Sequence, residues 1–237
     1  MRFQILDVEH GFCAYAEADN KNLMVFDCGH HGVNKFRPSS YFFNRGHRSI
    51  ESLFVTNYDE DHISDLPNVY SNLSILTLYR NKSISAEELR RLKLKSGFLS
   101  DAMKVLLHMI ESYTVGVSTP PDFPNMDWEI FHNNYPDFED TNNISLVVFL
   151  KCRNTTFLIP GDIEKPGWEE LLKQERFRQA LRGVDYFIAS HHGRENGYCR
   201  QVFDYCVPSA IIISDGPKKY ATQEMVNTYA QHARGIQ

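Results

Sequence analysis

The chain carries a short run of potential metal ligands at residues 57–62. Asn57, Asp59, Asp61 and His62 supply three side-chain oxygen donors and one imidazole within six residues. Carboxylates held this close together repel one another unless a cation lies between them. Oxygen and imidazole donors together suit a hard or borderline divalent cation. The run therefore indicates chemistry at a metal centre.

An apolar segment, residues 50–55, directly precedes this run and predicts the strand that positions it. Side chains at i, i+2 and i+4 of an extended chain point to one side. We therefore expect Asn57, Asp59 and Asp61 to converge, with His62 where the next helix begins.

Further potential ligands share the same position, directly after a predicted strand. They are Asp27, Asp162, His191 and His192. Loops at strand ends are where active sites on sheet scaffolds are assembled. The shared position favours one composite site over a set of separate turn formers.

The elements that must hold these residues are two runs of strands, each followed by helices. The predicted strands cover residues 3–6, 13–18, 23–26, 50–55, 73–78, 128–132, 145–152, 155–160, 184–189 and 210–214. The predicted helices are a helical insertion at about 84–116, with Ser85 and Glu88 as a capping box, and segments 168–181 and 222–232. With no low-complexity linker between the runs, we expect one α/β domain of two packed sheets with helices outside.

Composition narrows the class of protein. The chain has 237 residues, of which 42% are hydrophobic and 23% charged, as in folded globular proteins. A formal net charge of −5 argues against a broadly basic surface for nucleic acid. No signal peptide and no membrane span is recognisable, so a cytoplasmic protein is expected. Five cysteines without a C-x-x-C pair predict buried thiols in a reducing compartment.

Two other kinds of site do not fit the sequence. An EF-hand loop starting at Asp59 would need Gly at its sixth position and Glu at its twelfth, where this chain has Ser64 and Tyr70. A serine hydrolase would need a G-x-S-x-G elbow, which the chain lacks, and Ser190 precedes its histidines.

The motifs resemble those of the metallo-β-lactamase-fold hydrolases. The stretch Asn57-Tyr58-Asp59-Glu60-Asp61-His62 matches the family's first metal motif, and Asp162 after Gly161 matches its bridging aspartate. His192 resembles the family's last metal ligand in sequence order. Asp27 resembles the family's strand-end aspartate, which supports the site without binding the metal itself.

The chain is more similar to one branch, which contains the hydrolase domain of bacterial competence DNA-uptake channel proteins. The shared segments are Asp7-Val8-x-x-Gly11, Asp27-Cys28-Gly29, Asn142-Asn143-Ile144-Ser145-Leu146 and His191-His192-Gly193. The resemblance implies a four-layer αββα sandwich formed by residues 1–237 as one domain, with a metal centre between the sheets. It also implies truncation at the C-terminus, where the family usually continues into a last strand.

The chain departs from the family pattern at two positions. Asn57 and Asn143 stand where most members have histidine. The resemblance then implies one complete metal subsite and a second, incomplete one. The ligands left to the second subsite are Asp59 and Asp162, and Asp162 is also a ligand of the complete subsite. The complete subsite consists of Asp61, His62, Asp162 and His192. With more oxygen than imidazole ligands, Mn²⁺ is as suitable as Zn²⁺, and Mg²⁺ is an alternative.

The resemblance implies a metal-dependent hydrolase, with a phosphodiesterase or nuclease that uses a metal-activated water as the leading interpretation. Asp59 or Asp61 would orient that water or accept its proton, and His191 would donate to a phosphate oxygen. Lys218 and Lys219 are candidates for binding a substrate phosphate, although a solvated lysine pair would look the same. The expected substrate is DNA, RNA or a cyclic nucleotide, and a role in bacterial antiviral defence or nucleotide turnover would suit such an enzyme.

Two other functions remain open from the sequence. The first is a non-nucleolytic hydrolase of the same fold, acting on a lactone, a thioester or a cyclic nucleotide. The second is a pseudoenzyme that binds a partner protein or a nucleotide, which the asparagines at positions 57 and 143 favour. A protein partner or a homo-oligomer is compatible with either.

Overall fold

The computed structural model describes residues 1–95, 97–217 and 225–235. These residues form two compact units, Met1–Pro124 and Asn125–Gln237, and each unit is considered by itself. The single domain expected from the sequence stays a prediction. Lys218 and Lys219, the predicted phosphate-binding residues, lie outside the described residues.

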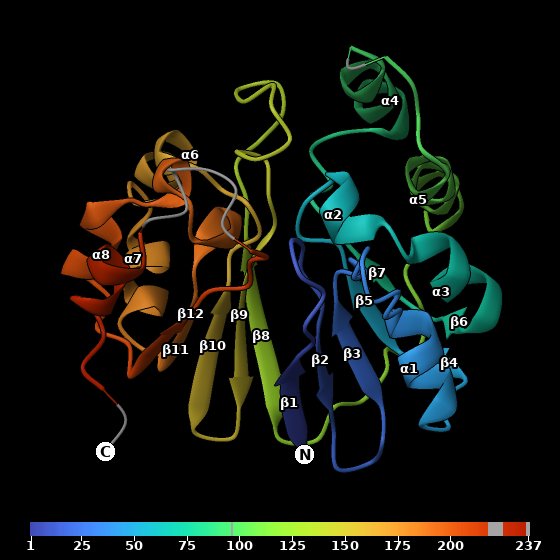
Figure 1. Cartoon of the computed structure of the whole chain (residues 1–237), viewed down its shortest axis with the longest axis horizontal. Helices are drawn as coiled ribbons and strands as arrows, with labels where there is room; N and C mark the ends of the chain where they lie inside the picture. Colours follow the sequence, from blue (N-terminus) through green and yellow to red (C-terminus); the bar gives the residue numbers. More distant parts are fainter. Residues whose placement is uncertain (96, 218–224, 236–237) are drawn as a thin grey trace. The chain divides into compact units, whose positions relative to one another are not determined.

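The first unit is built on a five-stranded sheet in the order β1-β2-β3-β5-β7 (Figure 1). Its strands are β1 (Arg2–Ile5), β2 (Ala14–Glu17), β3 (Leu23–Phe26), β5 (Ser52–Phe54) and β7 (Leu78–Tyr79). The first three pair antiparallel, whereas β3, β5 and β7 run parallel to one another. A separate parallel pair consists of β4 (Ser49–Ile50) and β6 (Ser74–Ile75).

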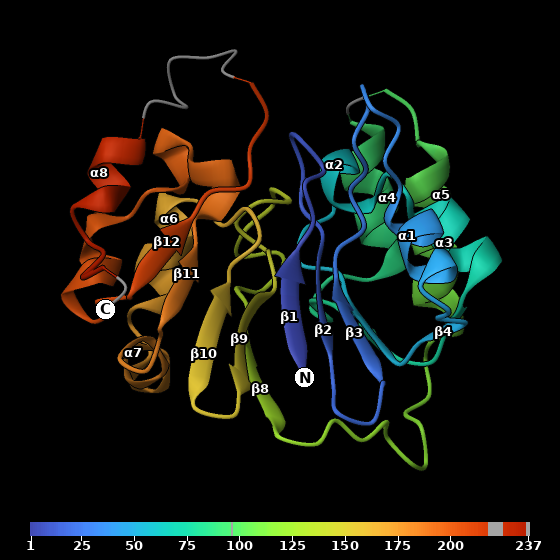
Figure 2. The ribbon, with the colours of Figure 1, turned by 60° about the horizontal axis from the view of Figure 1, so that its bottom comes forward.

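The helices of the first unit lie on one side of its sheet, as Figures 1 and 2 show. They are α1 (Pro38–Asn44), α2 (Glu60–Ile63), α3 (Leu66–Asn72), α4 (Ala86–Leu94) and α5 (Asp101–Ser112). The predicted capping box of α4 is confirmed, because the Ser85 hydroxyl accepts from Glu88 N at 3.2 Å and the Glu88 carboxylate accepts from Ser85 N at 2.9 Å.

The second unit repeats the strand pattern of the first. Its sheet has the order β12-β11-β10-β9-β8, with β8 (Met126–Phe131), β9 (Val147–Cys152), β10 (Thr155–Ile159), β11 (Tyr186–Ile188) and β12 (Ala210–Ile212). Here too three strands pair antiparallel, and the last of them, β10, begins a parallel run with β11 and β12. The α/β class and the repeated order of strands before helices are confirmed.

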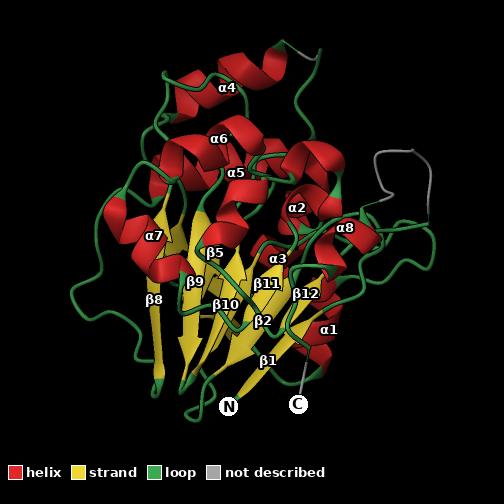
Figure 3. Ribbon diagram, turned by 90° about the vertical axis from the view of Figure 1, so that its left-hand side faces the viewer, coloured by secondary structure: helices red, strands yellow, loops and turns green. Residues whose placement is uncertain are grey.

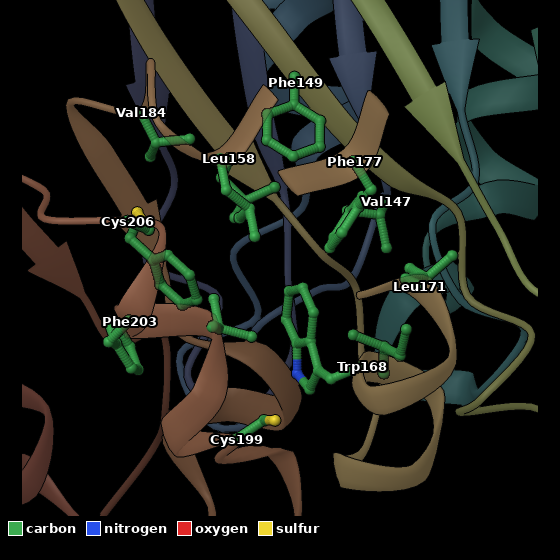
Figure 4. Packing of buried hydrophobic residues seen from close by; sticks show 14 of the residues in the cluster. Val147, Phe149, Leu158, Trp168, Leu171, Phe177, Val184, Cys199, Phe203 and Cys206 are labelled. Carbon is green, nitrogen blue, oxygen red and sulfur yellow. The ribbon is translucent and has the colours of Figure 1, made fainter. Parts of the chain in front are cut away.

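Helices α6 (Lys165–Leu171), α7 (Glu175–Leu181) and α8 (Val226–Ala230) complete the second unit, together with short 3₁₀ turns η1 (Ser190–Gly193), η2 (Glu195–Gly197) and η3 (Arg200–Asp204) (Figure 3). Trp168 lies at the centre of its core, where it faces Leu158 and Leu171 (Figure 4). The Trp168 indole N–H donates to Gly197 O at 3.0 Å, so this large side chain is buried without an unsatisfied donor.

Three predicted elements differ from the structure. Residues 168–181, expected as one helix, are two, because the N–H groups of Lys173 and Gln174 bond to carbonyls three residues back and tighten the chain into a turn. Segment 73–78 contributes to two short strands, β6 and β7, instead of one. Segment 50–55 is likewise divided at Glu51, whose carboxylate accepts from Leu23 N at 2.6 Å.

Two further expectations concern the cysteines and the presence of a membrane-spanning helix. All five cysteines are buried free thiols, as predicted. Among the described residues, no helix has the length and apolar character needed to cross a membrane.

Candidate metal centre

The predicted ligands lie directly after strands, and each of these strands pairs in parallel with a neighbour in its sheet. Asp27 follows β3 and the 57–62 run follows β5 in the first unit. In the second unit Asp162 follows β10, and His191 and His192 follow β11. Neighbouring parallel strands end at the same edge of a sheet, which is where ligands bind in open α/β folds. Each unit therefore gathers its candidate residues at one edge.

The backbone of the 57–62 run differs from the extended chain that the sequence suggested. Strand β5 ends at Phe54, and Asn57 Oδ1 accepts from Asp59 N at 2.7 Å, which turns the chain. Asp59 is the extended N-cap residue of helix α2, so Asp61 and His62 already lie in that helix. The expectation that Asp61 shares one side of an extended segment with Asn57 is therefore wrong.

His62 is held by Asp27, the residue that is expected from the sequence to support the metal ligands; that role at a metal stays a prediction. Both side chains are buried, and His62 Nδ1 lies 2.8 Å from Asp27 Oδ2. Asp27 also accepts from Thr56 N at 2.7 Å and from the Thr56 hydroxyl. Burial raises the pKa of the Asp27 carboxyl, and the contacts with His62 and Thr56 oppose that rise. A histidine whose Nδ1 bonds to a carboxylate presents Nε2 as its ligand atom, the usual arrangement in metal sites.

The loops that contain Gly11 and Gly29 hold the backbone of Asp61 and His62 by hydrogen bonds. Phe12 N donates to Asp61 O at 3.3 Å, and Cys28 N donates to His62 O at 2.8 Å. A Cβ on Gly11 or Gly29 would lie 2.6 or 2.0 Å from Asp61 O, closer than atoms can approach. The glycines at the ends of the Asp7-Val8-x-x-Gly11 and Asp27-Cys28-Gly29 segments thus allow the loops to close over α2.

His10 is a neighbour of the site that the sequence reasoning missed. Its Nε2 lies 3.4 Å from Asp61 Oδ2. The available signal was its position beside Gly11, inside a motif already noted for other reasons. His10 is suited to orient the Asp61 carboxylate.

The other two members of the 57–62 run make different contacts. The Asp59 carboxylate pairs with the ammonium of Lys93 on α4. Asn57 is fully buried, and its side-chain oxygen serves the turn before α2. The roles of Asn57 and Asp59 as metal ligands, and of Asp59 as a catalytic residue, stay predictions.

In the second unit Asp162 and His192 lie side by side. His192 Nε2 is 3.5 Å from Asp162 Oδ2, and both side chains are buried. His192 Nδ1 lies 2.9 Å from Ser214 O. A carbonyl oxygen can only accept, so Nδ1 carries the proton and Nε2 is the ligand atom. The same tautomer is thereby set at His192 and at His62.

The backbone at the two histidines is unusual. His191 has φ 50° and ψ 47°, and His192 has φ 56° and ψ 27°, so both residues are left-handed. This conformation costs roughly 1–2 kcal/mol for each non-glycine residue. The surrounding bonds hold it in place, since His191 N donates to Gly161 O at 3.2 Å and the Ser190 hydroxyl to Ile163 O at 2.5 Å. Such strain is characteristic of functional sites.

His191, the predicted proton donor, contacts two carboxylates of the second unit. Its Nδ1 lies 3.4 Å from Glu164 Oε1, and its Nε2 lies 4.0 Å from Asp162 Oδ2. Burial lowers the pKa of His191, and Asp162 and Glu164 oppose that effect. Glu164 was not among the residues singled out in the sequence. It is positioned by the side-chain amides of Asn142 at 3.0 Å and Asn196 at 2.7 Å.

Asn143, expected near the metal, is engaged with the start of α6. Its Oδ1 accepts from Gly167 N at 2.9 Å and from Glu164 N at 3.3 Å. Its Nδ2 donates to Asp140. A Cβ on Gly167 would lie 2.6 Å from this oxygen, so the glycine leaves room for the bond. These contacts assign Asn143 a capping role, and its supporting role at a metal stays a prediction.

Replacing Asp27 with asparagine is expected to weaken metal binding about 10- to 100-fold, because the amide no longer holds the His62 ring by a charged bond. Isothermal titration with Zn²⁺ and Mn²⁺ measures this change. Asp65→Asn is the matched control, since Asp65 is equally buried but accepts from Ser39 N at 2.8 Å and from Arg37. Equal metal affinity in the wild type and Asp27→Asn would contradict the orienting role.

No family model matches the chain. It is similar to ComE operon protein 3 of Bacillus subtilis (strain 168), with 21% identity over 178 residues. The match covers 73% of this chain and only 21% of that protein, so the chain spans about a fifth of the length of the relative.

Solved structures show a likeness in fold. The CmlA β-hydroxylase E377D mutant is 10% identical, with a TM-score of 0.50 over 92% of this chain and 47% of that chain. A putative metallo-β-lactamase from Thermotoga maritima is 14% identical, with a TM-score of 0.42 over 73% of this chain and 84% of that one. Zn²⁺-bound PqqB from Methylobacterium extorquens is 12% identical, with a TM-score of 0.42 over 76% and 59%.

Proposed function

We propose that this chain, which has the metallo-β-lactamase fold, is a metal-dependent hydrolase that acts on a phosphodiester. One observation carries the proposal. Each unit presents a carboxylate with a histidine whose Nδ1 is held by an acceptor, Asp27 for His62 and Ser214 O for His192. Histidines are fixed in this way where Nε2 binds a metal.

The proposal requires that the two pairs bind one ion jointly. As the family resemblance implies, Asp61 and His62 would supply one half of the ligands, and Asp162 and His192 the other. Two carboxylates and two imidazoles suit Zn²⁺ or Mn²⁺, and the hard carboxylates also admit Mg²⁺. A divalent cation there would lower the pKa of a water molecule and offset charge on phosphate oxygens.

The protein's own residues would orient the reactants. Asp61, whose carboxylate lies beside His10, would accept a proton from the attacking water. His191 lies between Asp162 and Glu164, and burial favours its neutral form. A neutral imidazole can still donate one N–H to a phosphate oxygen. The phosphodiester itself is proposed from the resemblance to the DNA-uptake branch.

Metal removal tests this function directly. The wild type is stripped with a chelator, dialysed, and assayed with bis-p-nitrophenyl phosphate and single-stranded DNA before and after Zn²⁺ or Mn²⁺ is added back. We expect turnover to vanish on stripping and return with metal. Asp162→Ala should stay inactive at all metal concentrations, whereas Asp204→Ala, an exposed carboxylate of the same unit, should match the wild type. Equal turnover in wild type and Asp162→Ala would overturn the proposal.

A pseudoenzyme is the second candidate, favoured by a specific observation. Both asparagines that replace family histidines make structural bonds, Asn57 to the turn before α2 and Asn143 to the start of α6. Absence of titratable metal binding by the wild type would support this alternative. Metal binding with turnover of a lactone or thioester but no phosphodiester would indicate the non-nucleolytic hydrolase.

A further inference from the structure

Three acidic residues lie in a row where helix α2 begins. Asp59 is the N-cap residue of the helix, and Glu60 and Asp61 form its first turn. Carboxylates this close repel one another unless positive charge lies beside them. The family resemblance would supply that charge at Asp59 with a second metal ion, in addition to the ion proposed at Asp61 and His62.

The groups expected to bind a second ion make other contacts in this structure. Asn57 Oδ1 accepts from Asp59 N at 2.7 Å and turns the chain. Asn143 Oδ1 accepts from two backbone N–H groups at the start of α6, which uses both lone pairs of that oxygen. The Asp59 carboxylate pairs with the ammonium of Lys93. These residues, as they are arranged, do not fit a second metal ion.

The Lys93 side chain is far less exposed than that of an ordinary surface lysine. It is 18% exposed, whereas the side chain of Lys104, which pairs with Asp101 on α5, is 61% exposed. A solvated pair such as Lys104 with Asp101 contributes little, because water screens both charges. The ammonium of Lys93 acts on Asp59 with less water around it, so their attraction is stronger.

Helix α4 holds Lys93 in place. The helix begins with the capping box described above and buries Leu89. Arg90 Nη2 lies 3.1 Å from Glu111 Oε1 and ties α4 to α5. Helix α5 packs against both α4 and α2 (Figure 1). The last turn of α4, which carries Lys93, is therefore fixed relative to the start of α2.

We propose that Lys93 takes the place of the second metal ion. A lysine ammonium is a compact point charge, and here it is the permanent positive partner of Asp59. It directs that carboxylate toward α4 and leaves Asp61 and His62 to bind a single ion. Lys93 is thus a positioning residue that acts through Asp59. The inference rests on the proposed function, because it concerns the same metal centre.

Counting bound metal tests this role without relying on turnover. Mn²⁺ is titrated onto chelator-treated protein, and the free ion is followed by electron paramagnetic resonance. Lys93→Met keeps the apolar stem but removes the charge. We expect this variant to bind one more equivalent than the wild type, because a hard cation that retains its waters needs only one or two carboxylates. Lys93→Arg keeps the charge and should bind as many ions as the wild type.

Lys104→Met is the matched control, because it removes the ammonium of a solvated lysine–aspartate pair in the same unit. It should bind as many ions as the wild type. The double variant Lys93→Met/Asp59→Asn should lose the extra equivalent, since the released carboxylate is then absent. Equal numbers of bound Mn²⁺ in the wild type and Lys93→Met would overturn the inference.

Asp59→Asn alone gives a second measurement that does not depend on the folding of Lys93→Met. We expect it to keep the metal affinity of the wild type, because Asp59 is directed to Lys93 and not to the metal. Weakening by more than about tenfold is the loss typical of a metal site residue and would overturn the inference.

The two proposals fail separately. An extra equivalent in Lys93→Met would support the role of Lys93 even if the wild type does not hydrolyse bis-p-nitrophenyl phosphate. Metal-dependent turnover by the wild type, with no extra equivalent in Lys93→Met, would overturn that role and leave the proposed function standing.

Discussion

Replacing His62 with alanine is expected to weaken metal binding by more than about 100-fold, and replacing His192 should have the same effect. Loss of an outer residue that only orients a ligand already costs 10- to 100-fold, so loss of a ligand itself should exceed that range. Turnover should fall to background in both variants, since the metal supplies the charge stabilisation for the reaction. Metal content after dialysis and titration calorimetry measure the change.

The two histidine variants also test whether one ion is shared. His62 belongs to the first unit and His192 to the second, and each is held through Nδ1 by its own unit. If the ligands act jointly, either substitution alone should abolish stoichiometric binding. His108→Ala on the exposed face of α5 and His132→Ala after β8 serve as controls in the two units. Retention of one metal equivalent by His192→Ala would contradict a shared site.

Replacing Gly29 with alanine is expected to destabilise the first unit by about 3 kcal/mol or more and to impair metal binding. The added Cβ would lie 2.0 Å from Asp61 O, and 3.0 and 3.1 Å from Phe12 O and N. All three are backbone atoms, which cannot move aside as a flexible side chain can. Overpacking in well-packed regions typically costs 1–3 kcal/mol, and a backbone clash this close belongs at the upper end. Urea denaturation without metal measures the loss of stability.

Gly32→Ala is the matched control for Gly29→Ala. Gly32 lies three residues further along the same loop, and a Cβ there meets no atom within 4 Å. We expect its stability to stay within about 0.5 kcal/mol of the wild type. If Gly29→Ala folds with wild-type stability and metal affinity, Gly29 does not hold Asp61 in the way described.

Much of the site could be predicted from the sequence because it follows from local order along the chain. Alternating and continuous apolar runs locate strands, and polar residues directly after them mark the loops where sites form. Asp27, Asp162 and the paired histidines were found in this way. Asp27 contacts His62, and its supporting role at a metal stays a prediction.

Contacts between segments distant in sequence could not be predicted in the same way. Asp59 pairs with Lys93, and Asn143 bonds to Gly167, because the folded chain brings these segments together. His10 and Glu164 escaped notice for the same reason. The extended geometry assumed for Asp61 was wrong because the Asn57 side chain bonds to the backbone and starts a helix earlier than the apolar pattern suggests.

The sequence by itself determined the types of ligand, their order, and their place after strands, because residue identity and apolar periodicity are local properties. Only the tertiary structure decided which nitrogen of His62 and His192 is presented, since the tautomer depends on acceptors 35 and 22 residues away. It also decided that two left-handed histidines persist after β11, because His191 N and the Ser190 hydroxyl donate hydrogen bonds to the carbonyls of Gly161 and Ile163 and so offset a conformation that the local chain disfavours.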